Sequence, residues 1–429
     1  MKHAQNKKLF SILLIVMVCL SLLVVSMNLF LGSANMISEV QKINGTQKFA
    51  TKDLLINELT PRLLYLINTT YYFSHDGSIK DIAITNDGLS LYVVTTSNLI
   101  KFGTNGTLLW NVSLNPTSDV NIEGVAVTRD DKFVYVVGYT GNLGYIEDLT
   151  IKLYKYNSSG ALVWTKTWST SYGGDVGYDI AVDSEGYVYV VGASWTLGAG
   201  SYFSLLLVKI DYEGNEVWNT TWSGLQASDY SVSDSYAYSI YISNNDIYIT
   251  GTISGSDYYY SVVTLKYDTN GNLIWADVLK QQNTDNRDCG ITIVKNGSFL
   301  YVLGKRSNSS GTFYFLLKYT IEGDFKWQIW INNVCRDITV LNKYVFVTGW
   351  FNYDIFISAY DMNGVLKHWV TWGTIDNEMS PLILSYANTN SIYEIGTISL
   401  ASGFSLYIQL WSPDFDFDSL PTYLSLIHI

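Results

Sequence analysis

The stretch YGGDVGYDIAVDSEGYVYVVGAS, residues 172–194, contains two short apolar runs, DIAV and YVYVVG, joined by the turn DSEG. Both runs are rich in β-branched and aromatic side chains, which favour strands. Because the same pair of runs returns along the chain, the chain is built from a repeated unit. The first run begins at residues 81, 124, 179, 239, 290, 337 and 381, and the second ends at residues 95, 138, 192, 251, 304, 349 and 396.

A second hairpin follows in most units, as in LVKIDYEGNEVW. Two β-rich runs around a glycine turn are typical of a hairpin. We expect the tryptophan after the turn to pack between units. We expect the lysine before the turn to belong to a solvated row or to lay its stem over tryptophan, rather than to form a substrate site. The tryptophans are Trp110, Trp164, Trp218, Trp275, Trp327 and Trp369, and the lysines are Lys101, Lys155, Lys209, Lys266 and Lys318.

A unit of four strands that repeats every 45 to 59 residues is typical of a β-propeller. The sequence therefore predicts an all-β fold, a seven-bladed β-propeller over residues 63–411. The seventh copy lacks a fourth strand, and the run LLYLINTTYYF, residues 63–73, is the candidate to supply it. Such an N-terminal strand would close the ring and leave no open sheet edge.

The stretch GGDVGYDIAVDSEGYVYVVGAS resembles the SBBP-type β-propeller repeat of exported prokaryotic proteins, and we expect an archaeal source. The half-repeat D-x-x-G-x-x-x-W is similar to the tryptophan-docked blades of quinoprotein-like propellers. Copies one and seven depart from the pattern, with Thr95 in place of the glycine and Pro381 in place of the first acid. The resemblance implies the fold but no catalytic residues, because the family is defined by its repeat.

The N-terminus differs from the rest of the chain. Lys2, Lys7 and Lys8 precede the uncharged run at residues 9–31, which is long enough to span a bilayer. The small residues GSA at 32–34 are of the kind that precede signal-peptidase cleavage. Residues 1–34 are therefore either a transmembrane signal anchor or a cleaved signal peptide, followed by a linker at 35–62. Both alternatives place the propeller outside the cell, anchored in the membrane or free.

Two further features bear on export. Cys289 and Cys335 either pair as a disulfide in an oxidising compartment or remain two unpaired thiols. Sequons of the form N-x-S/T are candidate glycosylation sites. They begin at Asn44, Asn68, Asn105, Asn111, Asn157, Asn219, Asn296 and Asn308.

The composition limits the function classes. A net charge of −12 argues against a nucleic-acid partner, which requires a basic surface. The sequence contains no G-x-S-x-G, H-E-x-x-H or C-x-x-C motif. Asp81, Asp179 and Asp337 begin innermost strands, where they bind a cation, cap backbone N–H groups or pair with nearby basic side chains. We therefore expect a non-enzymatic scaffold that binds a glycan or a cell-surface protein. The alternative is an exported enzyme that acts on polysaccharide or uses a quinone cofactor.

Long connections are expected to share one face of the propeller, because the connections inside each hairpin are short. Long loops on a rigid scaffold commonly carry binding residues, and tyrosine and tryptophan supply contact area at low entropic cost. The candidate ligand-binding residues in these loops are Tyr172, Asp175, Trp195, Tyr202, Asp229, Tyr258 and Tyr259.

The tail at 412–429 begins with an acidic stretch. Asp414, Asp416 and Asp418 alternate with other residues, which resembles a degenerate calcium loop, and calcium is the cofactor that this pattern suggests. The last six residues, LSLIHI, resemble the translation of a sequencing-library transposon end. We therefore expect the natural chain to continue past residue 423.

Overall fold

The computed structural model describes residues 42–43, 46–47, 69–73, 78–114, 120–141, 146–171, 173–196, 202–224, 234–254, 260–279, 286–352, 354–372, 377–389, 391–400 and 403–411. The chain divides into two compact units, Met1–Ile56 and Asn57–Ile429. In the first unit the described residues form one antiparallel pair, β1 (Lys42–Ile43) with β2 (Thr46–Gln47).

In the second unit the described residues form antiparallel sheets from strands that are consecutive in the chain. Sheet by sheet, the strands are β4 (Ile79–Ile84), β5 (Ser90–Thr95), β6 (Asn98–Gly103) and β7 (Leu108–Ser113); β8 (Val120–Val127), β9 (Phe133–Thr140), β10 (Thr150–Asn157) and β11 (Leu162–Trp168); β12 (Asp175–Val182), β13 (Val188–Thr196), β14 (Tyr202–Ile210) and β15 (Glu216–Trp222); β16 (Ser235–Ser243), β17 (Asp246–Ser254), β18 (Tyr260–Asp268), β19 (Leu273–Leu279), β20 (Arg287–Asn296), β21 (Phe299–Asn308), β22 (Gly311–Thr320) and β23 (Phe325–Ile331); β24 (Val334–Leu341), β25 (Tyr344–Phe351), β26 (Asp354–Asp361) and β27 (Leu366–Trp372); and β28 (Asn377–Tyr386), β29 (Ser391–Leu400), β30 (Gly403–Trp411) and β3 (Thr69–Phe73).

Two of these sheets differ from a simple run of four strands. The strands β16–β23 form one sheet because a single parallel pair, Tyr260 with Arg287, joins β18 to β20. In the last sheet β3 pairs with β30, from Thr69 opposite Ile408 to Phe73 opposite Phe404. The predicted pairing between a strand that precedes the first repeat and the last repeat is therefore confirmed over these residues.

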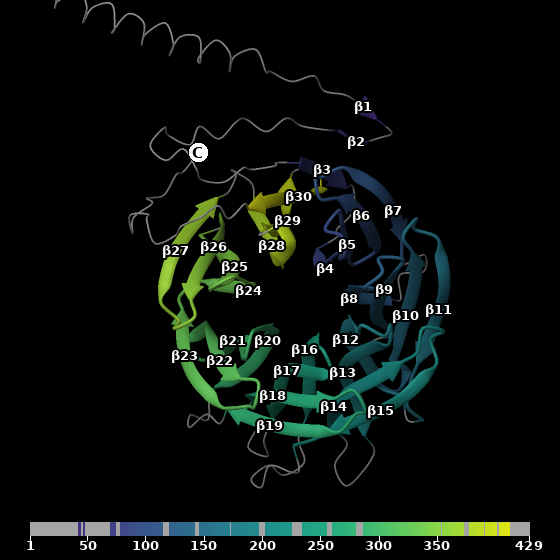
Figure 1. Cartoon of the computed structure of the whole chain (residues 1–429), viewed down its shortest axis with the longest axis vertical. Coiled ribbons are helices and arrows are strands. Elements are labelled where there is room, and N and C mark those ends of the chain that lie inside the picture. The colour runs from purple at the N-terminus through teal and green to yellow at the C-terminus, as the bar shows by residue number, and fades with distance from the viewer. Residues whose placement is uncertain are drawn as a thin grey trace, which may run out of the picture. The chain divides into compact units, whose positions relative to one another are not determined.

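The sheets of the second unit stand side by side in a ring (Figure 1). The first strand of each group of four lies nearest the ring axis, and the fourth lies on the outside (Figure 1). The helical elements among the described residues are two 3-10 turns, η1 (Ile146–Asp148) and η2 (Ala387–Thr389). Within the described ranges, no helix has the length and hydropathy that a membrane span requires. The described part of the second unit is therefore an all-β, propeller-like fold.

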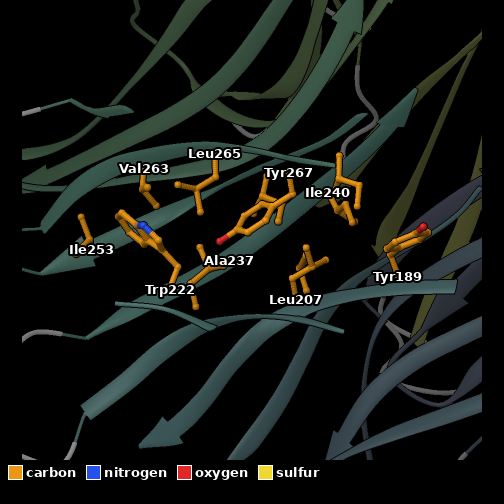
Figure 2. Close-up of a cluster of buried hydrophobic side chains, with 13 residues drawn as sticks. Tyr189, Leu207, Trp222, Ala237, Ile240, Ile253, Val263, Leu265 and Tyr267 are labelled. Atoms are coloured by element: carbon orange, nitrogen blue, oxygen red, sulfur yellow. The ribbon is translucent and has the colours of Figure 1, made fainter. Parts of the chain in front are cut away.

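The hydrophobic core lies between neighbouring sheets. Figure 2 shows one such layer, in which Leu207 of the sheet β12–β15 faces Ala237, Val263 and Leu265 from strands β16–β18. All four side chains are fully buried. Burial of an aliphatic side chain of this size stabilises a fold by about 1.5–3 kcal/mol. Each sheet therefore depends on its neighbours for most of its stability.

The repeated tryptophans pack against the glycine turn of the next sheet. A Cβ on Gly271 would lie 3.1 Å from the Trp218 ring, and its φ of 85° is a conformation that glycine adopts without strain. The indole N–H also reaches the next turn, as Trp164 Nε1 donates to the Tyr212 carbonyl at 3.3 Å. Packing between units is therefore confirmed for Trp110, Trp164, Trp218, Trp275 and Trp327, and it stays a prediction for Trp369.

Four of the five repeated lysines join the same contact, and the fifth, Lys266, forms an ion pair with Asp246 at 2.9 Å. Lys155 is 4% exposed, its Nζ donates to the Tyr212 carbonyl at 2.8 Å, and it lies 4.1 Å from the Phe133 ring centroid. The expectation of a solvated row is wrong for such residues, because a carbonyl and an aromatic face replace water around the ammonium group. We name this contact of a lysine and a tryptophan with the next glycine turn the inter-sheet clamp. Lys101, Lys209 and Lys318 donate in the same way to the carbonyls of Ser158, Thr269 and Met362.

The register of two repeats differs from the sequence alignment. Asp179 pairs with Val191, the residue before Gly192. In the fifth copy the residue that pairs with the position before the glycine is Thr292, opposite Leu303, and not Gly290. In the seventh copy it is Leu382, not Pro381. The turn between the two strands differs in length, from residues 183–187 in the third copy to residues 297–298 in the fifth, so a linear alignment does not place these residues.

The two cysteines among the described residues are unpaired. Cys335 is buried and Cys289 is partly buried, and both are free thiols. Of the two alternatives that the sequence leaves open, unpaired thiols are therefore confirmed.

Candidate functional site

The two ends of the strands carry different connections. At one end, which we name the short-turn end, lie the tight turns within each hairpin, such as residues 158–161 between β10 and β11. At the other, the long-loop end, the connections are long only between β7 and β20. Elsewhere at this end they are short, as at 309–310, 352–353 and 401–402. The predicted long loops are therefore confined to one part of the ring.

Three of the predicted ligand-binding residues lie at the long-loop end of the sheet β12–β15. Asp175 begins β12 opposite Ser194, Trp195 lies opposite Phe203, and Tyr202 begins β14. Trp195 and Tyr202 are partly exposed, whereas Asp175 is fully buried. The structure thus brings these three to one sheet end. The other candidates, Tyr172, Asp229, Tyr258 and Tyr259, lie outside the described residues.

Around Trp195, six aromatic side chains form a continuous series, which we name the aromatic array. It crosses three groups of strands at the long-loop end, and its rings meet edge-on, tilted or stacked. The ring centroids are 4.9 Å apart for Trp195–Phe203, 5.3 Å for Phe203–Tyr236, 6.2 Å for Tyr236–Tyr238, 5.4 Å for Tyr238–Tyr178 and 6.3 Å for Tyr178–Tyr139.

Bulges place two tyrosines of the array. The register shifts between Gly177 and Asp179 and between Ala237 and Ser239, so Tyr178 and Tyr238 are the extra residues of β12 and β16. Burial raises the pKa of both phenols above the usual value for tyrosine. No hydrogen bond joins either hydroxyl to another described residue. The array therefore combines ring faces with phenol hydroxyls.

Hydrogen bonds between sheets hold the backbone under the array. The Ser235 hydroxyl donates to the Trp222 carbonyl at 2.8 Å and accepts from the Leu205 N–H at 2.9 Å. The Asp234 carboxylate accepts from the Phe203 N–H at 2.8 Å. These contacts fix β14 against β16, so the array is preorganised.

Asp175 has a structural contact set. Its Oδ2 accepts from the Ser169 hydroxyl at 2.8 Å and from the Thr170 N–H and hydroxyl at 2.6 and 2.9 Å. Its Oδ1 is buried without a partner among the described residues. A ligand contact at Asp175 therefore stays a prediction, and the observed bonds order the turn before β12.

The innermost carboxylates bridge neighbouring sheets. Asp179 Oδ1 accepts from its neighbour Ile180 N–H at 2.7 Å, and Oδ2 accepts from the Ile240 N–H of the next group of strands at 2.9 Å. Asp81 and Asp337 make the same pair of bonds, to Ile82 and Val125 and to Ile338 and Ile383. The interpretation as backbone caps is therefore confirmed.

Burial is the main reason that the pKa of these carboxyls is raised. The pKa of Asp179 and that of Asp337 each rise to about 6, and that of Asp81 rises as well. The bonded N–H groups oppose this shift, because they favour the ionised form. No group of three or more potential metal-ligating side chains occurs within the described ranges.

The bulge position also carries charge elsewhere in the ring. Lys80 and Glu123 are the bulge residues of β4 and β8, and they form an ion pair at 3.1 Å between two sheets. Arg336 has the same position in β24. The bulge residue is therefore charged in β4, β8 and β24, aromatic in β12 and β16, and aliphatic, Ile291, in β20.

Sequence reasoning missed Tyr139, Tyr178, Phe203, Tyr236 and Tyr238. It placed the candidates in loops, whereas these residues lie in strands or at bulges. The available signal was the tyrosine directly before the innermost polar residue, in GYDI and in AYSI. Without the bulge, strand alternation places these side chains incorrectly.

The predicted glycosylation sites differ in exposure, and some of them lie outside the described residues, as do the predicted calcium ligands. Asn105, Asn111 and Asn219 are exposed, and Asn296 and Asn308 are partly buried. Asn157 is also partly buried, because its Oδ1 accepts from the N–H groups of Ser159 and Ala161 within a turn. The sequons at Asn44 and Asn68 and the acidic residues Asp414, Asp416 and Asp418 lie outside the described residues.

Comparison with known proteins identifies the repeat and the fold. The family model for the SBBP β-propeller repeat matches residues 163–197. No curated protein matches the chain. The β-propeller domain of Myceliophteria thermophila Cps50 (Swd1) is similar at a TM-score of 0.52 and 11% identity, over 82% of this chain and 99% of that chain. The RRP9 WD40 repeats are similar at a TM-score of 0.53 and 9% identity, over 81% and 97%.

The WD40 domain of Neurospora crassa Pan2 is also similar, at a TM-score of 0.52 and 11% identity, over 80% of this chain and 91% of that chain. Identities this low establish a shared fold and leave function to the site. Residues 163–197 thus carry an SBBP β-propeller repeat, within a chain whose described part has a WD40-like β-propeller fold.

Proposed function

We propose that this chain is a non-enzymatic extracellular scaffold that binds a glycan or a cell-surface protein at its long-loop end. The single observation that carries this proposal is the aromatic array. Six rings in contact, across three groups of strands, exceed what packing of one sheet requires. The array also lies where the long connections gather, as binding sites on rigid scaffolds commonly do.

The chemistry of the array favours a ligand with both apolar and hydroxyl-bearing surfaces. Ring faces pack against the C–H groups of a sugar or against side chains of a protein. A phenol hydroxyl, as in Tyr178 and Tyr238, can both donate and accept a hydrogen bond. Aromatic anchors of this kind commonly dominate binding energy.

The proposed architecture is a seven-bladed propeller closed by β3. Its support is that β16–β19 and β20–β23 each have the strand order of one repeat and share a single parallel pair. The pairing of β3 with β30 supplies the strand that the seventh repeat lacks. We further propose that residues 9–31 direct the chain out of the cell and anchor it, that the sequons are glycosylated and that the acidic tail binds calcium.

The binding proposal is tested with a glycan array and with capture of cell-surface proteins by the purified chain. The combined variant Trp195→Ala, Tyr178→Phe and Tyr238→Phe should weaken binding by about 30-fold, the loss that corresponds to ~2 kcal/mol. Trp330→Ala is the matched control, because Trp330 is a 48% exposed tryptophan on β23, outside the array. Equal losses in both variants, or none in the first, would contradict the proposal.

The location proposal is tested by adding protease to intact cells. Digestion of the propeller without lysis is the expected result. Complete protection that disappears only on lysis would count against export. Mass spectrometry of the same material reports glycosylation at the eight sequons.

A further inference from the structure

Arg336 on β24 is a cation without a counter-ion among the described residues. It is the bulge residue between Cys335 and Asp337, and its side chain is partly buried. Its Nε is buried without a hydrogen-bond partner, and no ion pair joins the guanidinium to a described residue. Burial of a charged donor without an acceptor is destabilising. Such a group is therefore expected to have a partner that accepts hydrogen bonds.

The neighbouring carboxyl of Asp337 does not supply that acceptor. Its Oδ1 accepts from the Ile338 N–H at 2.8 Å, and its Oδ2 accepts from the Ile383 N–H at 3.0 Å. Burial raises the pKa of Asp337 to about 6, and the charge of Arg336 is one of the effects that oppose this rise. The two side chains are thus near each other without forming an ion pair.

The same bulge position in other strands shows how the fold compensates a cation. Lys80, the bulge residue of β4, forms an ion pair at 3.1 Å with Glu123, the bulge residue of β8 in the next sheet. The strands β20–β23, which precede β24, place Ile291 at this position. An aliphatic side chain offers no charge, so the described neighbours of β24 leave Arg336 uncompensated.

A second cation lies on the neighbouring group of strands. β24 contacts β20, β21 and β22, which lie beside it in the ring (Figure 1). Lys305 on β21 pairs with Cys289 on β20 and with Tyr314 on β22, and paired residues share one face of a sheet. On this face Tyr314 packs against the buried cluster that contains Cys335, the residue before Arg336. Lys305 is exposed and forms no ion pair with a described residue.

The Tyr314 phenol adds a hydrogen-bond donor near both cations. Burial raises the pKa of this phenol, and the charge of Arg336 opposes the rise, as a nearby cation does. No hydrogen bond joins its hydroxyl to a described residue. Asp288, next to Cys289 in β20, points to the opposite face, where Arg306 binds it at 2.8 Å. Two cations and a hydroxyl therefore meet here, and no described carboxylate pairs with them.

We propose that Arg336, Lys305 and Tyr314 bind an oxyanion, a carboxylate or phosphate group of a ligand, at the long-loop end between β20–β23 and β24–β27. The fork of the guanidinium can hold two oxygens of such a group at once. Lys305 adds a point charge from the exposed side, and the phenol donates one further hydrogen bond. The three residues lie outside the aromatic array, so this inference does not depend on the proposed binding function.

The test is calorimetric titration of the full chain with inorganic phosphate and with acetate, at constant ionic strength. At least one of the two anions should bind, and the one that binds more tightly identifies the ligand group as phosphate or carboxylate. Arg336→Gln should weaken this binding at least about tenfold, because charge-assisted hydrogen bonds are lost. Lys80→Gln is the matched control, since it removes the same charge from the same bulge position, where Glu123 already compensates it. It should change the affinity less than twofold.

Lys305→Gln tests the site without disturbing a buried contact. Because Lys305 is exposed, the variant should fold normally and weaken anion binding by roughly threefold. Arg336→Lys keeps the charge but loses the fork, so its affinity should lie between those of the natural chain and Arg336→Gln. The proposal is overturned if neither anion binds, if Arg336→Gln and Lys80→Gln lose equal affinity, or if Lys305→Gln binds as the natural chain does.

Discussion

The strands β8–β19 and the strands β24–β30 with β3 use the same repeat in different ways. The first region combines long connections and the aromatic array with lysine–tryptophan clamps. In the second region the clamp lysine is replaced by Ala359 and Leu410, and polar side chains join the sheets instead. Thr348 donates to the buried Glu394 at 2.7 Å, and Thr339 to Ser385 at 2.9 Å. The two regions thus join their sheets by different side chains, and they differ in the length of the connections at the long-loop end. The fold therefore requires contacts between sheets but no particular set of connections.

The largest expected effect lies in the clamp of the first region. Trp218→Ala should lower the free energy of unfolding by roughly 3–5 kcal/mol, because it leaves a cavity against Tyr189 and the Gly271 turn. Trp369→Ala should cost less, because it removes a donor whose partner is absent from the described residues. Urea unfolding of both variants measures the difference. A larger loss at Trp369 would reverse the comparison.

The effect of pH should be the same in the two regions. Asp179 and Asp337 each have a pKa of about 6 in the fold, above the ordinary 3.8. Between these values the unfolded chain is ionised while the folded chain keeps its proton. The contribution of these two carboxyls to the free energy of unfolding is therefore fully present below pH ~4. It falls as pH rises through 6, by up to about 3 kcal/mol for each carboxyl.

The measurement is urea unfolding at pH 4, 5, 6 and 7 for the natural chain and for Asp179→Asn and Asp337→Asn. Each variant should flatten the profile by a similar amount while losing one backbone cap. If the pH profile of one variant stayed as steep as that of the natural chain, the replaced carboxyl would not be a group that titrates in this range. That result would contradict its raised pKa.

Single polar contacts between sheets should cost less. Lys155→Met keeps the stem but removes the hydrogen bond to Tyr212, and should cost about 1–2 kcal/mol. Thr348→Val in the second region removes the hydrogen bond to Glu394 and should cost a similar amount. Thermal unfolding of both variants shows whether the two kinds of contact are equivalent. An effect in only one of them would show which region depends on polar contacts.

The smallest effect on stability is expected at the array. Trp195→Ala should cost less than about 1 kcal/mol, because the side chain is partly exposed and, among the described aromatic residues, its ring contacts Phe203. Circular dichroism and thermal unfolding measure this. Global unfolding of the variant would mean that the array is part of the core of the first region.

The clamp was accessible from sequence because its parts are local. The glycine, the tryptophan and the lysine stand at fixed spacing within one hairpin, so the repeat exposes them directly. Their burial was not accessible, because Lys155 loses its water only when the next sheet brings the Tyr212 carbonyl to it. A prediction from charge alone therefore placed the clamp lysines in solvent.

The array could be predicted only in part. The sequence correctly placed Trp195 at the long-loop end, but the array also needs Tyr178 and Tyr238, which bulges bring together from two groups of strands. A bulge depends on pairing between strands and leaves no fixed sequence pattern. The fifth repeat was aligned at Gly290, whereas the structure aligns Thr292, because the turn between β20 and β21 is shorter than the turn between β12 and β13.

The pairing of β3 with β30 has a mechanical consequence. The two strands are antiparallel, and Thr69 lies opposite Ile408 while Phe73 lies opposite Phe404. The chain before β3 and the chain after β30 therefore both leave at the short-turn end. Force that pulls these two segments apart would open the ladder one hydrogen bond at a time. Force between the segment before β3 and a ligand at the long-loop end would run along β3, across bonds that are perpendicular to it. That direction loads the whole ladder at once, so the molecule resists traction on a bound ligand better than separation of its own two ends.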